Sequence, residues 1–337
     1  MKLIHADKDE LNFPHSPEVL NALKSISSEV FARYQKESEL LDFLSEYHSI
    51  PKERLFLETG VIGVIHRVFD YRLSKNSSVL LPEFGYPYYQ KLSKHHNANI
   101  QTFRFFRDKN SFSYDIEDLI KKLKAHPDIA VIIDPEAPLG FSTPEEKIRK
   151  ILEATPQDTL VVLDNTHEGF RKNKIDAVKL TNNFPNLLVT QSFSKFYGLA
   201  GVRIGYAICG KNVKKMANFK ERYLGFDGVA QKLAIAALKS KEHYKKNVQL
   251  INEQKQHLES FVRKIKGCIV FKTDSLYLVI EIPEEKKGKL KKAFEENNIA
   301  VRWLGDYWPE LKNFVRITTT PEEQTNSIIK VFQKIQG

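Results

Sequence analysis

A lysine stands among hydroxyl groups in the stretch SFSKFYGLAGVRIGY, residues 192–206, and an arginine follows it eight positions later. The amine of Lys195 suits covalent catalysis, because a lysine of lowered pKa forms a Schiff base with a carbonyl. The hydroxyls of Ser192 and Ser194 and the guanidinium of Arg203 are groups that bind a phosphate. A lysine-bound carbonyl beside a phosphate describes pyridoxal 5'-phosphate (PLP). The alternative for this stretch alone is a polar loop between two strands, with glycines at its turns.

The same stretch resembles the lysine motif of the fold-type I aminotransferases of class I and II, and most closely that of the histidinol-phosphate aminotransferase group. That motif reads approximately T-F-S-K-x-[FY]-G-L-A-G-x-R-x-G-Y. A second segment, VVLDNTHEGF, is similar to the family's V-V-D-E-A-Y-x-[ED]-F. The resemblance implies that Lys195 and Asp164 are catalytic, with Asp164 paired to the pyridine nitrogen of PLP so that the ring accepts electrons.

Further segments resemble the family's cofactor-binding positions. Gly60, Val61 and Ile62 in ETGVIGVIHRVF match a helix start whose backbone N–H groups bind the cofactor phosphate. Tyr86 in LPEFGYPYYQ matches the aromatic residue that stacks on the pyridine ring. The resemblance implies that Ser192, Ser194 and Arg203 complete the phosphate site. The alternative for Tyr86 is an ordinary core tyrosine, and the alternative for Gly60 is an ordinary glycine before a helix.

Two matches concern the substrate and a second subunit. Arg316 in NFVRITTTPEEQ stands where the family binds a substrate carboxylate with two hydrogen bonds. Tyr34 in ARYQKESELLDFL matches a tyrosine that in the family reaches the cofactor phosphate of the partner subunit. The resemblance therefore implies a homodimer with shared sites.

Three activities remain open at this stage. The resemblance favours a PLP-dependent aminotransferase of amino-acid metabolism. Glutamate is the expected amino donor, and the acceptor is a keto compound, with or without a phosphate group. A PLP-dependent decarboxylase of a phosphorylated amino acid, similar to threonine-phosphate decarboxylase, shares the same motifs. The third reading is a non-catalytic basic binding protein on the same fold.

Three positions depart from the family pattern. Ala137 in DPEAPLG replaces the asparagine that hydrogen-bonds the phenolic oxygen of the cofactor, and alanine has no donor. His167 in DNTHEGF replaces a tyrosine that bonds the same oxygen, and a histidine ring nitrogen can donate in its place. Leu276 replaces an asparagine common in the histidinol-phosphate group. We expect these changes to alter the pocket while leaving cofactor binding intact.

The elements that position these residues follow an α/β pattern. Apolar strands SVLLP, IAVIID, TLVVLD and NLLVTQS are separated by helical segments such as DIEDLIKKLKAH and TPEEKIRKILEAT. This alternation predicts a mostly parallel sheet between helices, which in the family has seven strands. Asp134, Asp164 and Ser192 follow three of these strands, so we expect them to meet in one crevice at the carboxyl edge.

The order of elements predicts three parts of the chain. Residues 1–30 form an N-terminal arm, and residues 31–228 form the large PLP-binding domain. Residues 229–337 form a long connecting helix, from about 229 to 265, and a smaller α+β domain. Trp303 and Trp308 are expected in the core of that smaller domain.

Composition limits the possible partners. The net charge of +10 comes from lysines spread along predicted helical faces, which favours a solvated surface over a nucleic-acid site. No apolar run is long enough for a membrane span, and no secretory signal is evident, so a cytoplasmic protein is expected. Cys209 and Cys268 lack zinc-site spacing and are expected to be buried free thiols. We expect no metal.

Overall fold

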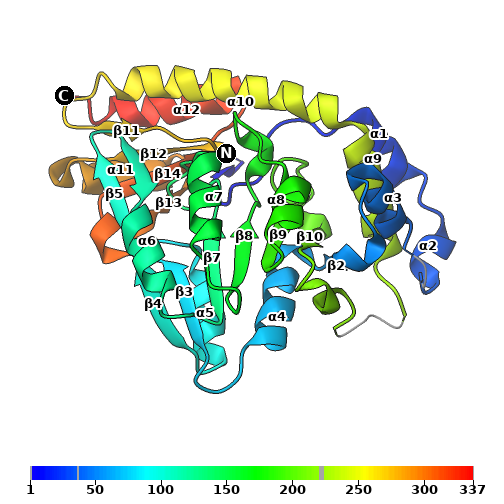
Figure 1. Cartoon of the computed structure of the whole chain (residues 1–337). Helices are drawn as coiled ribbons and strands as arrows, with labels where there is room; N and C mark the ends of the chain where they lie inside the picture. Colours follow the sequence, from blue (N-terminus) through cyan, green and yellow to red (C-terminus); the bar gives the residue numbers. More distant parts are fainter. Residues whose placement is uncertain (1, 36–37, 220–223, 337) are drawn as a thin grey trace.

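The large sheet has seven strands in the order β2-β10-β9-β8-β7-β3-β4 (Figure 1). The computed structural model describes residues 2–35, 38–219 and 224–336. The strands are β2 Leu55–Glu58, β3 Ser78–Pro82, β4 Asn99–Phe103, β7 Ile129–Ile133, β8 Leu160–Asp164, β9 Leu187–Ser192 and β10 Gly205–Cys209. The strands from β9 to β4 pair in parallel, whereas β10 is antiparallel to both its neighbours. The predicted α/β class with a mostly parallel sheet is confirmed.

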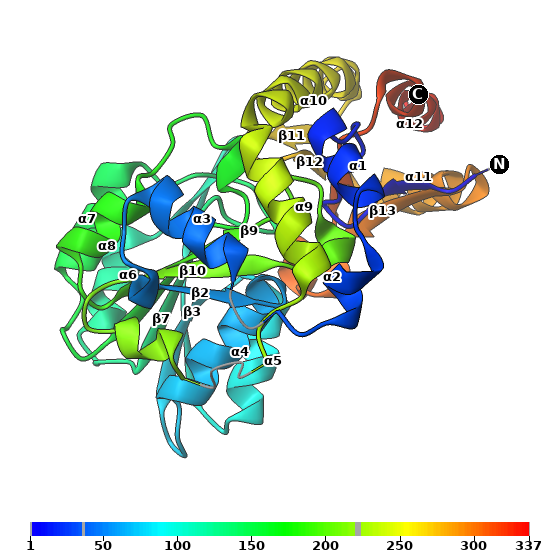
Figure 2. The same ribbon diagram turned by 90° about the vertical axis from the view of Figure 1, so that its right-hand side faces the viewer.

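Helices cover both faces of this sheet, which explains why β7 and β8 are buried along their whole length. One face packs on α4 Gly60–Arg72 and α5 Pro87–His95. The other face packs on α3 Glu39–His48, α6 Ile116–Leu123, α7 Glu145–Glu153, α8 Ala177–Asn183 and α9 Gly228–Lys239 (Figure 2). The loops after the parallel strands therefore emerge between two helical layers, at one edge of the sheet.

The second sheet has five strands in the order β1-β13-β14-β12-β11. Its strands are β1 Ile4–Ala6, β11 Ile269–Phe271, β12 Tyr277–Glu281, β13 Ile299–Trp303 and β14 Phe314–Thr318. It packs on α10 Lys241–Val262, α11 Glu284–Glu296 and α12 Glu322–Gln333. Because β1 pairs in parallel with β13, the beginning of the predicted arm is an edge strand of this smaller sheet.

The remaining elements are short. They are α1 Pro17–Lys24, α2 Ser28–Ala32, the hairpin β5 Phe105–Asp108 and β6 Ser111–Tyr114, and the 3-10 helices η1 Lys52–Arg54, η2 Glu168–Phe170, η3 Ala200–Val202, η4 Lys214–Ala217, η5 Leu304–Asp306 and η6 Pro309–Leu311.

The prediction of one long helix from about residue 229 to 265 is wrong, because α9 ends at Lys239 and α10 begins at Lys241. Ser240 breaks the helix with φ −104° and ψ 29°. Its hydroxyl lies 2.8 Å from the hydroxyl of Ser16 and also 2.8 Å from the carbonyl oxygen of Ala236. The break lets α9 pack on the large domain while α10 runs along the smaller one. The predicted bounds of the three parts stay a prediction.

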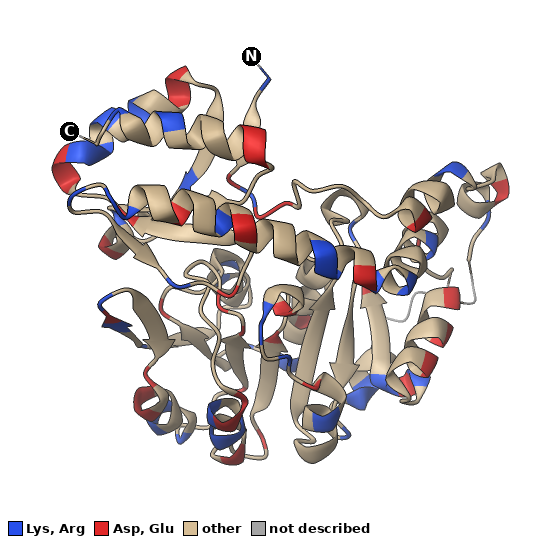
Figure 3. Ribbon diagram, turned by 90° about the horizontal axis from the view of Figure 1, so that it is seen from above, with Lys and Arg blue, Asp and Glu red and all other residues tan. Residues whose placement is uncertain are grey.

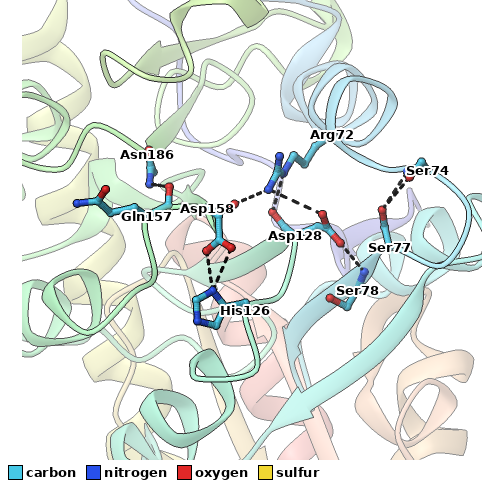
Figure 4. A network of polar contacts seen from close by, with 9 residues as sticks. All are labelled: Arg72, Ser74, Ser77, Ser78, His126, Asp128, Gln157, Asp158 and Asn186. Carbon is cyan, nitrogen blue, oxygen red and sulfur yellow. Dashed lines mark hydrogen bonds and ion pairs between the residues drawn. The ribbon is translucent and has the colours of Figure 1, made fainter.

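A polar network ties the loops before β3, β7 and β8 at the amino edge of the sheet (Figure 4). Arg72, the last residue of α4, donates from Nε to the carbonyl oxygen of Asp128 at 3.2 Å. The Asp128 carboxylate accepts from the backbone N–H of Ser78 at 2.9 Å, and Nδ1 of His126 lies 2.8 Å from Asp158. These bonds connect the loops that precede three of the parallel strands.

Figure 3 shows Lys and Arg positions interspersed with Asp and Glu positions along the helices. Among the described helices, none has the length and apolar character that a membrane span requires. Over the same described residues, no cluster of three or more His, Cys, Asp or Glu side chains is arranged for a metal ion. Both cysteines are free; Cys209 is buried as predicted, but Cys268 is only partly buried, at the edge of the small-domain core.

Candidate active site

A cavity of about 630 Å³ opens at the carboxyl edge of the large sheet, between the two domains. The N-terminal arm, the starts of α4 and α5, the loops after β8 and β9, and β13 and β14 all contribute to its walls. The predicted residues that line it are Val61, Ile62, Tyr86, Asp164, His167, Ser192, Ser194, Lys195, Arg203 and Arg316. The structure thus brings together side chains that lie up to 255 positions apart, from Val61 to Arg316. Their individual roles stay predictions.

Lys195 lies in the loop between β9 and β10. Its Nζ donates a hydrogen bond to the carbonyl oxygen of Lys8 at 2.9 Å. Burial lowers the pKa of Lys195; the nearby Asp9 carboxylate opposes this shift, and Arg316 adds to it. A lowered pKa increases the fraction of neutral amine, which is the form that attacks a carbonyl or accepts a proton.

Asp164 ends β8 with its carboxylate buried among hydrogen-bond donors. Oδ1 accepts from the backbone N–H of Thr166 at 3.1 Å and from its hydroxyl at 2.6 Å. The hydroxyl of Thr190 also donates to Oδ1 at 3.1 Å, and Tyr89 donates to Oδ2 at 2.8 Å. These bonds fix the carboxylate at the cavity wall. Sequence reasoning missed Tyr89, although it stands in the quoted segment LPEFGYPYYQ.

His167 is only 3% exposed, and burial lowers its pKa to about 3, so the ring is neutral. Its Nδ1 lies 2.8 Å from the hydroxyl of Ser275, which comes from the small domain. The backbone carbonyl of Ser275 accepts from Nζ of the buried Lys255 at 2.8 Å. The turn that holds His167 is therefore anchored to α10. Sequence reasoning missed Ser275 and Lys255, because no local signal marks a contact across 108 positions.

The start of α4 forms a cradle with Arg203. Gly60 has a φ of +67°, and a Cβ added to it would come within 2.8 Å of Nη2 of Arg203. Only glycine leaves that space open, and the N–H groups of the first turn of α4 lie beside it. On the other side, the Ser192 hydroxyl accepts from the N–H of Ser194 at 3.1 Å. Helix N–H groups, hydroxyls and a guanidinium fit the phosphate of PLP.

Arg316 projects into the cavity from β14 and meets the N-terminal arm. Its Nη2 lies 2.9 Å from Oδ2 of Asp9, and its Cζ lies 4.8 Å from the centre of the Tyr277 ring. Arg302, its register partner on β13, also lines the cavity and donates from Nη1 to the hydroxyl of Tyr307 at 2.6 Å. Sequence reasoning gave no role to Asp9 or Arg302.

Two predicted residues lie outside the cavity lining. Gly60 sits behind it, where its missing side chain makes room for Arg203. Tyr34 follows α2, is 74% exposed, and is not among the residues that line the cavity of this single chain. Its predicted reach into a second subunit's site stays a prediction.

Of the three positions that depart from the family pattern, Ala137 and His167 line the cavity. Ala137 lines the cavity, whereas the preceding Glu136 is fully buried. Burial raises the pKa of Glu136 to about 8, against the opposing effects of the Leu139 and Gly140 N–H groups and of Arg316. Leu276 is buried and does not line the cavity.

The two tryptophans belong to different core clusters. Trp303 packs in the small-domain core as predicted. Trp308 belongs to a different core cluster, which holds residues of both domains, and it also lines the cavity.

Comparisons with known proteins agree with this geometry. The sequence profile described as "Aminotransferase class I and II" matches residues 9–332. A histidinol-phosphate aminotransferase of Methanococcus maripaludis is 24% identical over 337 residues, covering 99% of this chain and 90% of that protein. Another, of Ruminiclostridium cellulolyticum, is 27% identical over 293 residues, covering 86% of this chain and 79% of that protein.

The fold also matches a solved structure. The crystal structure of histidinol-phosphate aminotransferase from Sinorhizobium meliloti in complex with pyridoxal-5'-phosphate has a TM-score of 0.88 at 19% sequence identity, and the match covers 98% of this chain and 92% of that one. This likeness confirms the fold-type I architecture. Because the family profile spans nearly the whole length, this chain belongs to the class I and II aminotransferases.

Proposed function

We propose that this protein is a PLP-dependent aminotransferase that moves an amino group between an amino acid, with glutamate as the expected donor, and a phosphorylated keto compound. The observation that carries the proposal is the meeting of Lys195, Asp164 and the cradle beside Gly60 at one cavity. The two curated relatives are histidinol-phosphate aminotransferases, which supports this class of substrate.

Each side chain then has one task. PLP, when bound, supplies an aldehyde for the substrate amine and a ring that accepts electrons from the substrate Cα. Lys195 moves the proton at that Cα, first as general base and then as general acid, and its lowered pKa suits both steps. Asp164 holds a proton on the pyridine nitrogen, and its four hydrogen bonds keep the carboxylate in place.

The substrate's anionic group binds at the small-domain wall of the cavity. Arg302 and Arg316 are register partners on β13 and β14, and both line the cavity; Lys91, from α5 of the large domain, lines it as well. A guanidinium binds a carboxylate or a phosphate through parallel hydrogen bonds. Two adjacent arginines support a substrate that carries a phosphate.

Because transamination is reversible, the test runs the reaction in reverse: PLP-saturated protein is incubated with histidinol phosphate and 2-oxoglutarate, and the glutamate formed is measured. We expect glutamate to form, and pyridoxamine phosphate to accumulate when 2-oxoglutarate is left out. Histidinol without the phosphate is the matched control, for which we expect a lower kcat/KM. Release of CO2 from threonine phosphate without glutamate from any donor would support the decarboxylase instead. No reaction and no spectral change on adding PLP would support a non-catalytic protein.

The protein is also proposed to act as a homodimer. Four apolar side chains on or after α1 and α2 are exposed: Leu20 (44%), Leu23 (53%), Phe31 (68%) and Tyr34 (74%). An exposed apolar group of this kind is typical of an interface. Sedimentation should give a dimer, and Phe31→Asp should shift it toward the monomer; a monomeric wild type would contradict the proposal.

The cytoplasm is the proposed location. Both cysteines are unpaired, as thiols are in a reducing compartment. Fractionation of cells that make the protein should recover it with cytoplasmic markers.

A further inference from the structure

The N-terminal arm crosses the cavity next to the lysine and the arginine described above. Lys8, Asp9 and Glu10 all line the cavity. On one side of this segment β1 pairs with β13, and on the other Asn12 donates to the carbonyl oxygens of His5 at 3.0 Å and Thr319 at 3.1 Å. The arm is thus tied to the small domain at both ends of the crossing.

Asp9 is held with its carboxylate toward Arg316. Its backbone N–H donates to the hydroxyl of Thr318 at 3.1 Å, and that hydroxyl lies 3.4 Å from Oδ1. Its φ is +55°, in the left-handed region that few residues other than glycine, asparagine and aspartate adopt. Asp9 is 6% exposed, so the ion pair is shielded from water.

The ion pair with Asp9 uses only some of the hydrogen-bond donors of the Arg316 guanidinium. The Asp9 carboxylate pairs with Nη2 of Arg316, whereas Nε of Arg316 is buried and has no hydrogen-bond partner among the described residues. The carboxylate of Asp9 has the same chemistry as the carboxylate of an amino-acid substrate. A substrate that binds Arg316 must therefore displace Asp9 or share the guanidinium with it.

We propose that Asp9 is a specificity-determining residue that competes with a substrate carboxylate for Arg316; this inference rests on the proposed function, in which Arg316 binds the substrate. Asp9 neutralises one of two neighbouring arginines and so weakens the binding of a carboxylate that depends on Arg316. Removing the charge of Asp9, with its shape kept, strengthens that binding.

The experiment titrates glutarate, a dicarboxylate that resembles glutamate without its amine, into PLP-saturated protein and measures its Kd by calorimetry. We expect Asp9→Asn to bind glutarate about tenfold more tightly than the wild type, the effect of about one charge-assisted hydrogen bond. Glu10→Gln is the matched control, because it removes the same charge from the adjacent cavity-lining residue, for which no ion pair with Arg316 is found. We expect less than a twofold change there.

In turnover with glutamate, Asp9→Asn should lower KM while changing kcat less. If the asparagine variant does not fold, as judged by circular dichroism, Asp9→Ser replaces it with the same expectation. Glutarate bound no more tightly by the variant than by the wild type, or tightened equally by Glu10→Gln, would overturn the inference. Glutarate binding is measured without turnover, so a protein that lacks aminotransferase activity would contradict the proposed function alone.

Discussion

Replacing Glu136 with glutamine should make the protein more stable at alkaline pH. Glu136 is fully buried, and burial raises its pKa from 4.5 to about 8. In the unfolded chain the same carboxyl ionises near its ordinary pKa, so the folded state binds one more proton between these two values. The stability that comes from this proton is fully present below pH 4.5 and is lost as the pH rises through 8.

The size of the effect follows from the width of this window. Each unit of difference in pKa corresponds to about 1.4 kcal/mol. The free energy of unfolding of the wild type therefore falls by roughly 3 to 5 kcal/mol as the pH rises across this window. Glutamine resembles the protonated acid, and its carbonyl oxygen can keep the hydrogen bond that Glu136 Oε2 accepts from the Leu139 N–H at 2.7 Å. The variant should therefore escape the loss.

Urea unfolding followed by circular dichroism, at pH 5 and pH 8, measures the prediction. Wild type and Glu136→Gln should differ little at pH 5, and the variant should be more stable by several kcal/mol at pH 8. Glu146→Gln makes the same chemical change at an exposed position on α7 and should show no such dependence. An equal difference between wild type and Glu136→Gln at both pH values would refute the reasoning.

Two other predictions concern the cofactor site. Gly60→Ala should weaken PLP binding at least tenfold in a fluorescence titration, because its Cβ would clash with Arg203 in a strained backbone; Gly201→Ala, where nothing lies within 4 Å of the new Cβ, should leave the affinity unchanged. Ser275→Ala removes the partner of His167 Nδ1 and should change the ¹⁵N NMR signature of that ring, with Ser275→Thr restoring it. Unchanged affinity in Gly60→Ala, or an unchanged ring signal in Ser275→Ala, would contradict these roles.

The sequence was sufficient to predict the α/β class and its mostly parallel sheet because the signals for them are local. Continuous apolar strands such as residues 129–133 and 160–164 appeared where expected, since both faces of the sheet are covered. The motif around Lys195 holds several cavity residues within a dozen positions, and Asp164 ends a recognisable strand.

The missed features depend on contacts between distant segments. Asp9 meets Thr318 across 309 positions, and Ser275 meets His167 across 108. The break between α9 and α10 has a similar origin, because Ser240 bonds Ser16, which is 224 positions away. The charged helical pattern continues through that break and gives no sign of it.

The most direct test of the central claim asks which lysine PLP modifies. The protein is incubated with PLP, reduced with borohydride, digested and analysed by mass spectrometry. The account predicts a phosphopyridoxyl group on Lys195, at a stoichiometry near one per chain, and its loss from that peptide in Lys195→Ala. Label confined to surface lysines, or Lys195 left unmodified at saturating PLP, would contradict it.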